Sequence, residues 1–546
     1  MNGAILLLAA LAVFGLGYFL YSRYLGRLAG VDPSRPTPAT AQRDDVDYVP
    51  AHPLVLFGHH FAAIAGAGPI VGPVFAAEFG WGAVALWVVL GATLIGAMHD
   101  MFALFLSVRH RGESIGVVIG ELIGGPARNL FLVFSWAVLV LVVAEFTRQI
   151  ALTFVTDAAI ATSSMLFIGE AVLFGLCVHR FKTSVLAASL VFVPLMFASV
   201  WVGELYPLDL VAWGLSARSA QAVWAVVLLG YCFFASVCPV WVLLQPRGYL
   251  SSYLLYVMAA LGVFGVFFAR PELTLPAFAG FAVPHGDGCV DTLFPMLFVV
   301  VSCGACSGTH AIIASGTTSK QLASERHIRP IAYGGLLLEG LLAIVATVAV
   351  AAAYANTGEF FSALEGHAPA QLFAGSIAGF CAKAGVPLRF TEGFILLSIS
   401  AFLMTTVDAC ARLGRFSWQE LAAAAPAPLR GRSFSTLLVC AAAALLWGGM
   451  DRPSGLWAIL MSANQLIAAL TLLAATLHLA KTGRPCWLTF VPMLFMLAVA
   501  VWALILLFGH SASQGDPVLS VATGFLLVLA ALLVFQAVVR RPRDSR

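Results

Sequence analysis

Five ionisable side chains lie inside strongly apolar stretches of this sequence, where they could bind a solute or carry a proton. His59 and His60 lie early in one stretch, His99 and Asp100 lie late in the next, and Glu339 lies in a third. An ionisable group is costly to hold inside a membrane, so these residues are functional candidates. Imidazole titrates near neutral pH, which suits proton coupling or recognition of a carboxylate. Adjacent helical residues point about 100° apart, so we expect only one of His59 and His60 to face a solute.

Residues 54–80 offer backbone chemistry, because helix-breaking residues lie in the middle of an apolar span. These residues are Gly66, Gly68, Pro69, Gly72 and Pro73. Proline removes a helix hydrogen bond, and glycine weakens a helix. Unwound backbone is tolerated at membrane depth only where protein or a wet cavity satisfies its polar groups. We therefore predict a discontinuous helix over residues 54–80.

A second interrupted stretch, residues 291–318, is centred on small and polar residues. Free N–H groups at two such breaks, helped by the dipoles of the half-helices, can hold an anionic solute near the middle of the membrane. The alternative is that these small residues only let helices approach closely. The backbone candidates for substrate binding are Gly66, Ala67, Gly68, Ser302, Gly304, Ser307, Gly308 and Thr309, and they join His59 and His60.

Other polar residues of the apolar stretches are interpreted as structural. Glu145 and Arg148 are three residues apart on one helix face, where they can pair with each other. Asn464 and Gln465 lie in a late apolar stretch, where amide side chains typically make hydrogen bonds between helices.

Metal chemistry is disfavoured by the spacing of the candidate ligands. His52 and His59 are seven residues apart, which does not place a compact set of ligands on one helix face, and no HExxH motif occurs. The ten cysteines, including the CxxC pair Cys303 and Cys306, build no zinc or disulfide framework. We predict no metal site, no cofactor and no enzymatic activity, with a metal-dependent membrane enzyme as a distant alternative.

The elements that position these residues must be membrane helices. Of the 546 residues, 61% are hydrophobic and only 10% are charged, whereas soluble domains carry about 25% charged residues. Apolar windows of about 20 residues, the length that crosses a bilayer, recur from end to end. No nucleic-acid-binding face and no separate soluble domain is visible, so membrane lipid is the expected surrounding and a small molecule the expected partner.

Hydropathy predicts an all-α polytopic protein with about fifteen transmembrane helices. The spans are residues 2–22, 54–80, 81–108, 129–155, 158–179, 183–205, 219–243, 249–269, 291–318, 330–356, 391–411, 433–450, 454–480, 485–508 and 517–539. If the loops alternate between sides, one side collects 23 and the other 6 of the 29 Lys and Arg residues. The positive-inside rule makes the richer side cytoplasmic. We therefore expect the N-terminus in the periplasm and the C-terminus in the cytoplasm of a bacterial inner membrane.

This topology sends the two interrupted spans in opposite directions. A lone acid follows each break at a similar distance, with Asp100 34 residues after Gly66 and Glu339 35 residues after Gly304. Two oppositely directed breaks in corresponding halves indicate an inverted-repeat transporter. The predicted units are a peripheral helix (1–22), a five-helix repeat (54–205), two intervening helices (219–269), a second five-helix repeat (291–480), and two C-terminal helices with a basic tail (485–546). Residues 112–125 and 367–384 are predicted short helices and candidate gates.

Long sequence motifs carry a family resemblance. They are DYVPAHPLVLFGHHFAAIAGAGPIVGPVFAAEFGW from Asp47, PVWVLLQPRGYL from Pro239, SCGACSGTHAIIASGTTSKQL from Ser302, RPIAYGGLLLEG from Arg329, TTVDACARLGR from Thr405 and SANQLIAALTL from Ser462. With these motifs, residues 1–480 resemble the carbon starvation protein A (CstA) family. The resemblance implies uptake of peptides or amino acids under nutrient limitation or, in a related branch, of pyruvate. It also implies the amino acid, polyamine and organocation superfamily, with its LeuT-like 5+5 core and two discontinuous helices.

The resemblance also suggests a coupling ion. In LeuT-like proteins the third helix of the second repeat offers paired hydroxyls to sodium, and Thr405 and Thr406 match that position, with Asp408 nearby for charge. Oxygen ligands suit a hard cation. One alternative is that these hydroxyls bond back to carbonyls of their own helix. The other is a proton as the coupling ion, carried by Asp100, Glu339, Asp408 or a histidine.

Two further functional classes fit the sequence less well. A channel needs polar residues around a pore but does not need two oppositely directed breaks. A nutrient sensor on a transporter scaffold would need a signalling domain, which the sequence does not show. The sequence therefore predicts a secondary active transporter that takes up peptides or amino acids as a symporter, with pyruvate as the alternative substrate.

Overall fold

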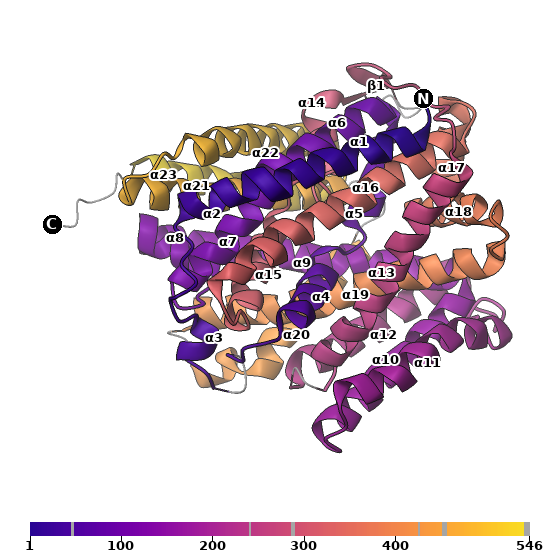
Figure 1. Ribbon diagram of the computed structural model, residues 1–546, viewed down its shortest axis with the longest axis horizontal. Helices are drawn as coiled ribbons and strands as arrows, with labels where there is room; N and C mark the ends of the chain where they lie inside the picture. The colour runs from indigo at the N-terminus through magenta and orange to yellow at the C-terminus, as the bar shows by residue number, and fades with distance from the viewer. Residues whose placement is uncertain (45–47, 240–241, 285–289, 424–425, 450–455, 540–546) are drawn as a thin grey trace.

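The computed structural model describes residues 1–44, 48–239, 242–284, 290–423, 426–449 and 456–539. These residues form helices joined by short loops, with one small two-stranded sheet (Figure 1). The first helices are α1 (Gly3–Leu16), α2 (Ser22–Ala29), α3 (Pro38–Ala41), α4 (Pro53–Ile64), α5 (Gly68–Ala76), α6 (Trp81–Leu90), α7 (Ala97–Arg109), α8 (Ile115–Ile123) and α9 (Gly125–Thr156).

The rest of the chain continues the same pattern. Its middle elements are α10 (Ala158–His179), α11 (Val185–Leu205), α12 (Ala217–Val237), α13 (Leu244–Ala269), β1 (Ala282–Pro284), β2 (Val290–Thr292), α14 (Leu293–Val300) and α15 (Gly308–Gly316). Its last elements are α16 (Gly334–Ala353), α17 (Thr357–Gly366), α18 (Pro369–Ala382), α19 (Leu388–Leu421), α20 (Arg432–Gly449), α21 (Leu456–Lys481), α22 (Trp487–Ser513) and α23 (Pro517–Val539).

Thirteen helical segments within the described residues are long and apolar enough to cross a membrane. They correspond to thirteen of the predicted spans. The predicted span 291–318 is divided into α14 and α15, and the predicted span 433–450 corresponds to the shorter helix α20. The prediction of an all-α polytopic membrane protein is therefore confirmed.

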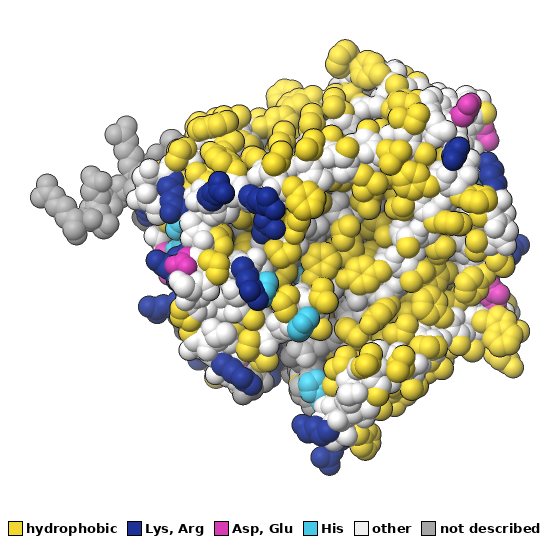
Figure 2. Space-filling model, in the orientation of Figure 1, with side chains coloured by type: hydrophobic (Ala, Val, Ile, Leu, Met, Phe, Trp, Pro, Cys, Tyr) yellow, Lys and Arg dark blue, Asp and Glu magenta, His cyan; other side chains and the backbone are white. Residues whose placement is uncertain are grey.

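The outer surface of the bundle is apolar, as expected of a protein whose solvent is lipid. Figure 2 shows hydrophobic side chains over most of one face, with the Lys and Arg side chains gathered mainly at the left. Large hydrophobic residues such as Leu90, Leu190 and Trp201 are exposed on membrane helices. Large exposed apolar surfaces are unusual in soluble monomers and mark contact with lipid here.

Hydrogen bonds tie helix ends together at two opposite ends of the bundle. At one end, Arg109 at the end of α7 donates to the carbonyl of Gly30 after α2 (2.6 Å) and to Glu325 (3.0 Å). We call it the basic end, and its basic residues include Arg109, Arg128, Lys320, Lys481 and Arg484. At the other end, Gly3 at the start of α1 donates to the carbonyl of Pro271 beyond α13 (2.8 Å). The first span therefore runs from this opposite end toward the basic end.

Two long helices, α9 and α19, pack along each other through the centre of the bundle. Both are largely buried, and α12 and α20 pack on both of them as well as on each other. On the two sides, α13 packs against α19 and α4, while α21 packs against α9, α14 and α15. The hairpin of α10 and α11 lies at the edge of the bundle (Figure 1).

Several helix boundaries differ from the predicted ones. Helix α13 begins at Leu244, five residues before the predicted span, so Arg247 lies inside a helix rather than in a loop. Helix α19 extends beyond the predicted span at both ends. The predicted short helices are α8, within residues 112–125, and α18, within residues 367–384. Arg452 and the predicted basic tail with Arg540, Arg541, Arg543 and Arg546 lie outside the described residues.

Candidate functional site

Both predicted breaks are present, and the two broken segments run in opposite directions. The first break separates α4, which ends at Ile64, from α5, which begins at Gly68. The second separates α14, which ends at Val300, from α15, which begins at Gly308. At the basic end, Ala51 before α4 pairs as a β-bridge with Leu322 after α15, so the first segment starts where the second ends.

Glycines let the two broken segments touch each other. A Cβ atom on Gly68 would overlap Sγ of Cys303 in the second break, and one on Gly72 would lie 2.6 Å from the carbonyl oxygen of Val300. A Cβ atom on Gly304 would lie 2.6 Å from Cβ of Ala343 in α16. These positions therefore have room only for hydrogen, as both the binding and the close-packing interpretation of these residues require.

Asn464 of α21 caps the second break from outside the broken segment. Its Oδ1 accepts hydrogen bonds from the backbone N–H and the hydroxyl of Thr309, both at 2.7 Å, and its Nδ2 donates to Ser307 (3.0 Å). Gln465 donates to the carbonyl of Phe298, near the end of α14 (2.8 Å). The half-helices leave backbone groups without helical partners, and these two amides satisfy some of them. The predicted interhelical role of both amides fits these contacts.

A histidine of the second broken segment joins two acids that the sequence placed at corresponding positions. His310, in the first turn of α15, is hydrogen-bonded through Nδ1 to Oδ2 of Asp100 in α7 (2.8 Å). Its Nε2 lies 3.3 Å from Oε2 of Glu339 in α16. The other carboxylate oxygen of Asp100 lies 2.8 Å from Nδ1 of His99. All four side chains are buried, and we call His99, Asp100, His310 and Glu339 the histidine–acid cluster.

Glu339 is the least satisfied member of this cluster. Neither of its carboxyl oxygens has a hydrogen-bond partner among the described residues, although one lies at ion-pair distance from His310. An ionised carboxylate that is buried without hydrogen bonds is strongly unfavourable. Glu339 is therefore the position in the cluster where binding a proton would relieve the largest cost.

The two adjacent histidines of α4 point to different neighbours. His60 is buried, and its Nδ1 lies 2.8 Å from the hydroxyl of Thr318 at the end of the second broken segment. His59 lies against α13, where a Cβ atom on Gly248 would be 3.0 Å from its Nδ1. The geometry agrees with the expectation that both cannot face the same site. His60 also links α4 to the segment that carries His310.

The predicted sodium-site hydroxyls are engaged within the protein. Thr405 donates to the carbonyl of Ala401 (2.7 Å), and Thr406 donates to the carbonyl of Phe402 (3.1 Å). Thr406 nevertheless lies beside the first break, since a Cβ atom on Gly66 would be 3.1 Å from its hydroxyl oxygen. Each hydroxyl donates in these bonds and keeps its oxygen lone pairs, so the bonds do not prevent either oxygen from binding an ion.

Asp408 belongs to a second buried polar cluster, which it forms with residues of α12 and α13. Its Oδ2 accepts from Nη1 of Arg247 in α13 (2.5 Å) and from the hydroxyl of Tyr231 in α12 (2.7 Å). Arg247 also donates to the carbonyl of Ala401 (3.3 Å), and its side chain is fully buried. This cluster ties α12, α13 and α19 together.

Glu145 and Arg148 form the predicted pair on one face of α9. Arg148 donates to both carboxylate oxygens of Glu145 at 2.8 Å, and Gln149 donates to one of them at the same distance. The neighbouring ring of Phe146 lies beside Gly66, about 3.5 Å from where a Cβ atom would be, and stacks with Trp457 of α21. The pair therefore lies next to the first break, on the side away from the basic end.

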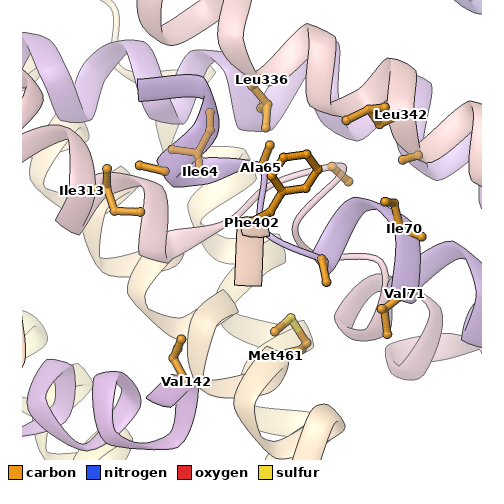
Figure 3. Close-up of a cluster of buried hydrophobic side chains, with 14 of the residues drawn as sticks. Ile64, Ala65, Ile70, Val71, Val142, Ile313, Leu336, Leu342, Phe402 and Met461 are labelled. Atoms are coloured by element: carbon orange, nitrogen blue, oxygen red, sulfur yellow. The ribbon is translucent and has the colours of Figure 1, made fainter. Parts of the chain in front are cut away.

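Apolar side chains fill the space around the two breaks. Figure 3 shows the ring of Phe402 against Ala65 at the first break, with Leu336 above them and Met461 on the opposite side. Met461 also receives hydrogen bonds from Ser302 and Cys303. Transport through this region therefore requires the apolar side chains to move apart.

Three site residues escaped the sequence analysis. His310 lies inside the predicted second interrupted span, and the rule that intramembrane ionisable residues are functional candidates would have found it. Arg247 was assigned to a loop because the predicted span began two residues later. Tyr231 carried no signal beyond its place in an apolar stretch, where tyrosine is common. No group of three or more side chains suited to holding a metal ion occurs in the described part of the chain.

Comparison with known proteins identifies the family. The model of the family described as "Carbon starvation protein CstA" matches residues 2–365 and 352–503. The chain belongs to the CstA family. The resemblance that the motifs indicated is therefore confirmed.

Curated relatives extend over most of the chain. The peptide transporter CstA of Escherichia coli (strain K12) is 33% identical, over 92% of this chain and 81% of its own length. The peptide transporter CstA of Bacillus subtilis (strain 168) is 28% identical, over 99% of this chain and 97% of its own length. The pyruvate/proton symporter BtsT of Escherichia coli (strain K12) is 30% identical, over 91% of this chain and 81% of its own length. This CstA-family chain is accordingly a multi-pass transporter of the inner membrane.

Proposed function

We propose that this transporter takes up small peptides or amino acids together with protons, and that the histidine–acid cluster carries the proton. The observation that carries the proposal is His310, which lies in the second broken segment between Asp100 and Glu339. Proton movement on this cluster changes the charge beside the break. A change of charge at that point can therefore be linked to movement of α15.

Glu339 is the proposed proton acceptor within the cluster. Its two oxygens lack hydrogen-bond partners among the described side chains, whereas both carboxylate oxygens of Asp100 are paired with histidines. A proton on Glu339 removes the cost of an unsatisfied buried carboxylate. Loss of that proton strengthens the attraction to His310, which pulls the first turn of α15 toward α16. The two states of Glu339 therefore favour different positions of the half-helix.

We further propose that the broken segments belong to a LeuT-like inverted-repeat core. The packing supports corresponding roles for the long helices α9 and α19, and for α12 and α20, which each pack on both long helices. Helices α8 and α18 also correspond, because α8 packs against α9 and α18 packs against α19, in each case the long helix that follows in sequence. Helices α13 and α21 match in the same way, since each packs against the long helix of the other half. This pairing favours α12 and α13, rather than α10 and α11, as the last two helices of the first repeat. The hairpin of α10 and α11 is then an insertion.

The basic end is proposed to be cytoplasmic. The residues that gather there include most of the Lys and Arg side chains on the face seen in Figure 2, and cytoplasmic loops are enriched in these residues. The N-terminus of α1 then faces the periplasm. In this orientation a solute enters between the outer halves of the broken segments and leaves toward the basic end.

Two substrate classes follow from the relatives. Peptides or amino acids are favoured by the relatives named peptide transporters, and pyruvate with protons is the second candidate because one relative is named a pyruvate/proton symporter. In both cases the carboxylate is proposed to bind the backbone N–H groups at Gly66, Ala67 and Gly68 and at the second break, with the release of Thr309 from Asn464.

The function is tested with purified protein in sodium-free liposomes. An inward proton gradient should drive accumulation of radiolabelled dialanine, a protonophore should abolish it, and unlabelled pyruvate should compete only if the second candidate holds. Added sodium should leave the uptake unchanged. Accumulation that needs sodium and ignores the proton gradient would instead assign the coupling to Thr405 and Thr406.

A further inference from the structure

A cavity of about 310 Å³ opens near the basic end, lined by residues other than those of the histidine–acid cluster. It lies between α8, α9, α15 and α19. Its wall combines a lysine, two glutamates and several hydroxyls with an apolar lining. The residues that matter below are Glu113, Ser135, Lys320, Phe416 and Glu420.

Lys320 supplies a positive charge that the protein leaves available. Its ammonium lies 5.4 Å from the ring centre of Tyr48 and 5.9 Å from that of Phe416. These are cation–π contacts, and they orient the ammonium without neutralising it. Within the described residues its ammonium group has no hydrogen bond or ion pair, so it is free to bind a carboxylate.

The opposite charge is supplied by Glu420 and Glu113. Oε2 of Glu420 is buried and has no hydrogen-bond partner among the described residues, and it makes only a long ion pair with Arg128, at 3.9 Å. The hydroxyl of Ser135 is also buried without a hydrogen-bond partner among the described residues, in a side chain that is only 2% exposed. A buried polar group without a partner is costly, so these two atoms are suited to meet a polar ligand.

The cavity lies on the route from the breaks to the basic end. Ser135 is seven residues before Val142 on α9, and Leu413 is seven residues after Thr406 on α19. At about 1.5 Å of rise per residue, each interval is about 10 Å. Val142 belongs to the apolar cluster at the breaks (Figure 3), so both helices place the cavity about 10 Å beyond the region where a solute would be held.

We propose that this cavity is a second substrate station, which binds a small zwitterion, an amino acid or a dipeptide, before it is released at the basic end. Lys320 binds the carboxylate, Glu420 and Glu113 bind the ammonium, and Ser135 bonds to a polar atom between them. The inference rests on the proposed transport function. It also separates the two substrate classes, because pyruvate has no ammonium and leaves both glutamates without a partner.

Apolar side chains on the same wall suit the side chain of such a ligand. Phe131 and Leu132 of α9 and Phe416 of α19 line the cavity together with the charged groups. A site with one cation, nearby anions and an apolar wall matches the two ends and the side chain of an amino acid. Opposite charges in fixed positions give specificity, since a ligand that lacks one end leaves a buried group unpaired.

The experiment uses the two orientations of bacterial membrane vesicles. Inverted vesicles present the basic end to the medium, and right-side-out vesicles present the other end. Dialanine and pyruvate are the probes, and the variants are Lys320→Gln and Glu420→Gln. The controls are Lys383→Gln and Glu204→Gln, which remove the same charges at the opposite end of the bundle.

We expect both test variants to raise the half-saturating dialanine concentration about tenfold in inverted vesicles, as loss of one charge-assisted hydrogen bond does. In right-side-out vesicles the half-saturating dialanine concentration should change less than twofold. The half-saturating pyruvate concentration should be the same as in the wild-type protein in both orientations. An equal rise in both orientations, or no rise in either, overturns the second station.

A binding measurement keeps this outcome separate from failure of the transport proposal. If the wild-type protein moves no dialanine in either orientation, peptide transport is wrong. Calorimetry of the purified protein with dialanine then tests whether the cavity binds dialanine, independently of transport. Binding that is lost in Lys320→Gln and retained in Lys383→Gln supports the site, and equal binding by all variants, or its absence in the wild-type protein, rules it out.

Discussion

Removing one partner of the Arg247–Asp408 pair should destabilise the transporter far more than removing both. In Asp408→Asn the fully buried guanidinium of Arg247 loses its counterion and keeps only neutral partners, namely Tyr231, the carbonyl of Ala401 and the amide oxygen of the new side chain. Charge-assisted hydrogen bonds contribute about 1.5–3 kcal/mol each. Breaking a buried pair from one side costs about 3–5 kcal/mol, and the single variant should lose stability in this range.

The double variant Arg247→Met with Asp408→Leu is the matched control. Apolar residues of similar volume can replace a buried ion pair at little cost, because both desolvation penalties disappear. Most of the loss seen in the single variants Arg247→Met and Asp408→Leu should therefore be recovered, with a coupling of about 3 kcal/mol in the double-mutant cycle that these three variants form with the wild-type protein.

Thermal unfolding of the purified protein, followed at a fixed scan rate, measures this effect. A change of 1 kcal/mol shifts the unfolding temperature by about 2–4 °C in chains of 150–250 residues and by less in larger ones. We expect Asp408→Asn to unfold at least about 3 °C below the wild-type protein. The double variant should unfold at a temperature near that of the wild-type protein. If the stability losses of the two single variants simply add in the double variant, the reasoning is refuted. A stable double variant without uptake would give the pair a role in transport itself.

Three further predictions concern the breaks. Asn464→Ala should lower stability by about 2–4 kcal/mol, because it removes three hydrogen bonds of 2.7–3.0 Å at Ser307 and Thr309, and a wild-type unfolding temperature would contradict this. Gly68→Val should abolish uptake while membrane insertion persists, whereas Gly230→Val, which meets open space, should transport normally. Thr406→Val should leave uptake unchanged in the presence and absence of sodium, and a loss confined to sodium-containing medium would restore the sodium site.

The parts of the fold that were predictable depend on local chemistry. Gly66, Gly68 and Pro69 weaken or end a helix through their own backbone chemistry, so the first break could be placed from sequence. Loop charge and hydropathy together gave the opposite directions of the two broken segments. The similar spacing from Gly66 to Asp100 and from Gly304 to Glu339 singled out two acids, and the structure brings both of them to His310.

The contacts between distant segments were not predictable in the same way. Asp100 and Glu339 are 239 residues apart in sequence and meet at one imidazole only because α7, α15 and α16 pack together. Asp408 was expected near an ion site, yet its partner Arg247 comes from a helix whose start was placed too late. Helix ends are set by capping and packing rather than by hydropathy, which explains why a buried arginine at the start of α13 was assigned to a loop.

Proton movement through Glu339 is the central claim, and simultaneous recording of dialanine uptake and internal pH in liposomes tests it most directly. The wild-type protein should acidify the interior as it accumulates dialanine. Glu339→Gln should exchange dialanine across the membrane without acidification or accumulation, while Glu170→Gln, which removes a buried acid of α10 outside the cluster, should behave as wild type. Accumulation with acidification by Glu339→Gln would contradict the account.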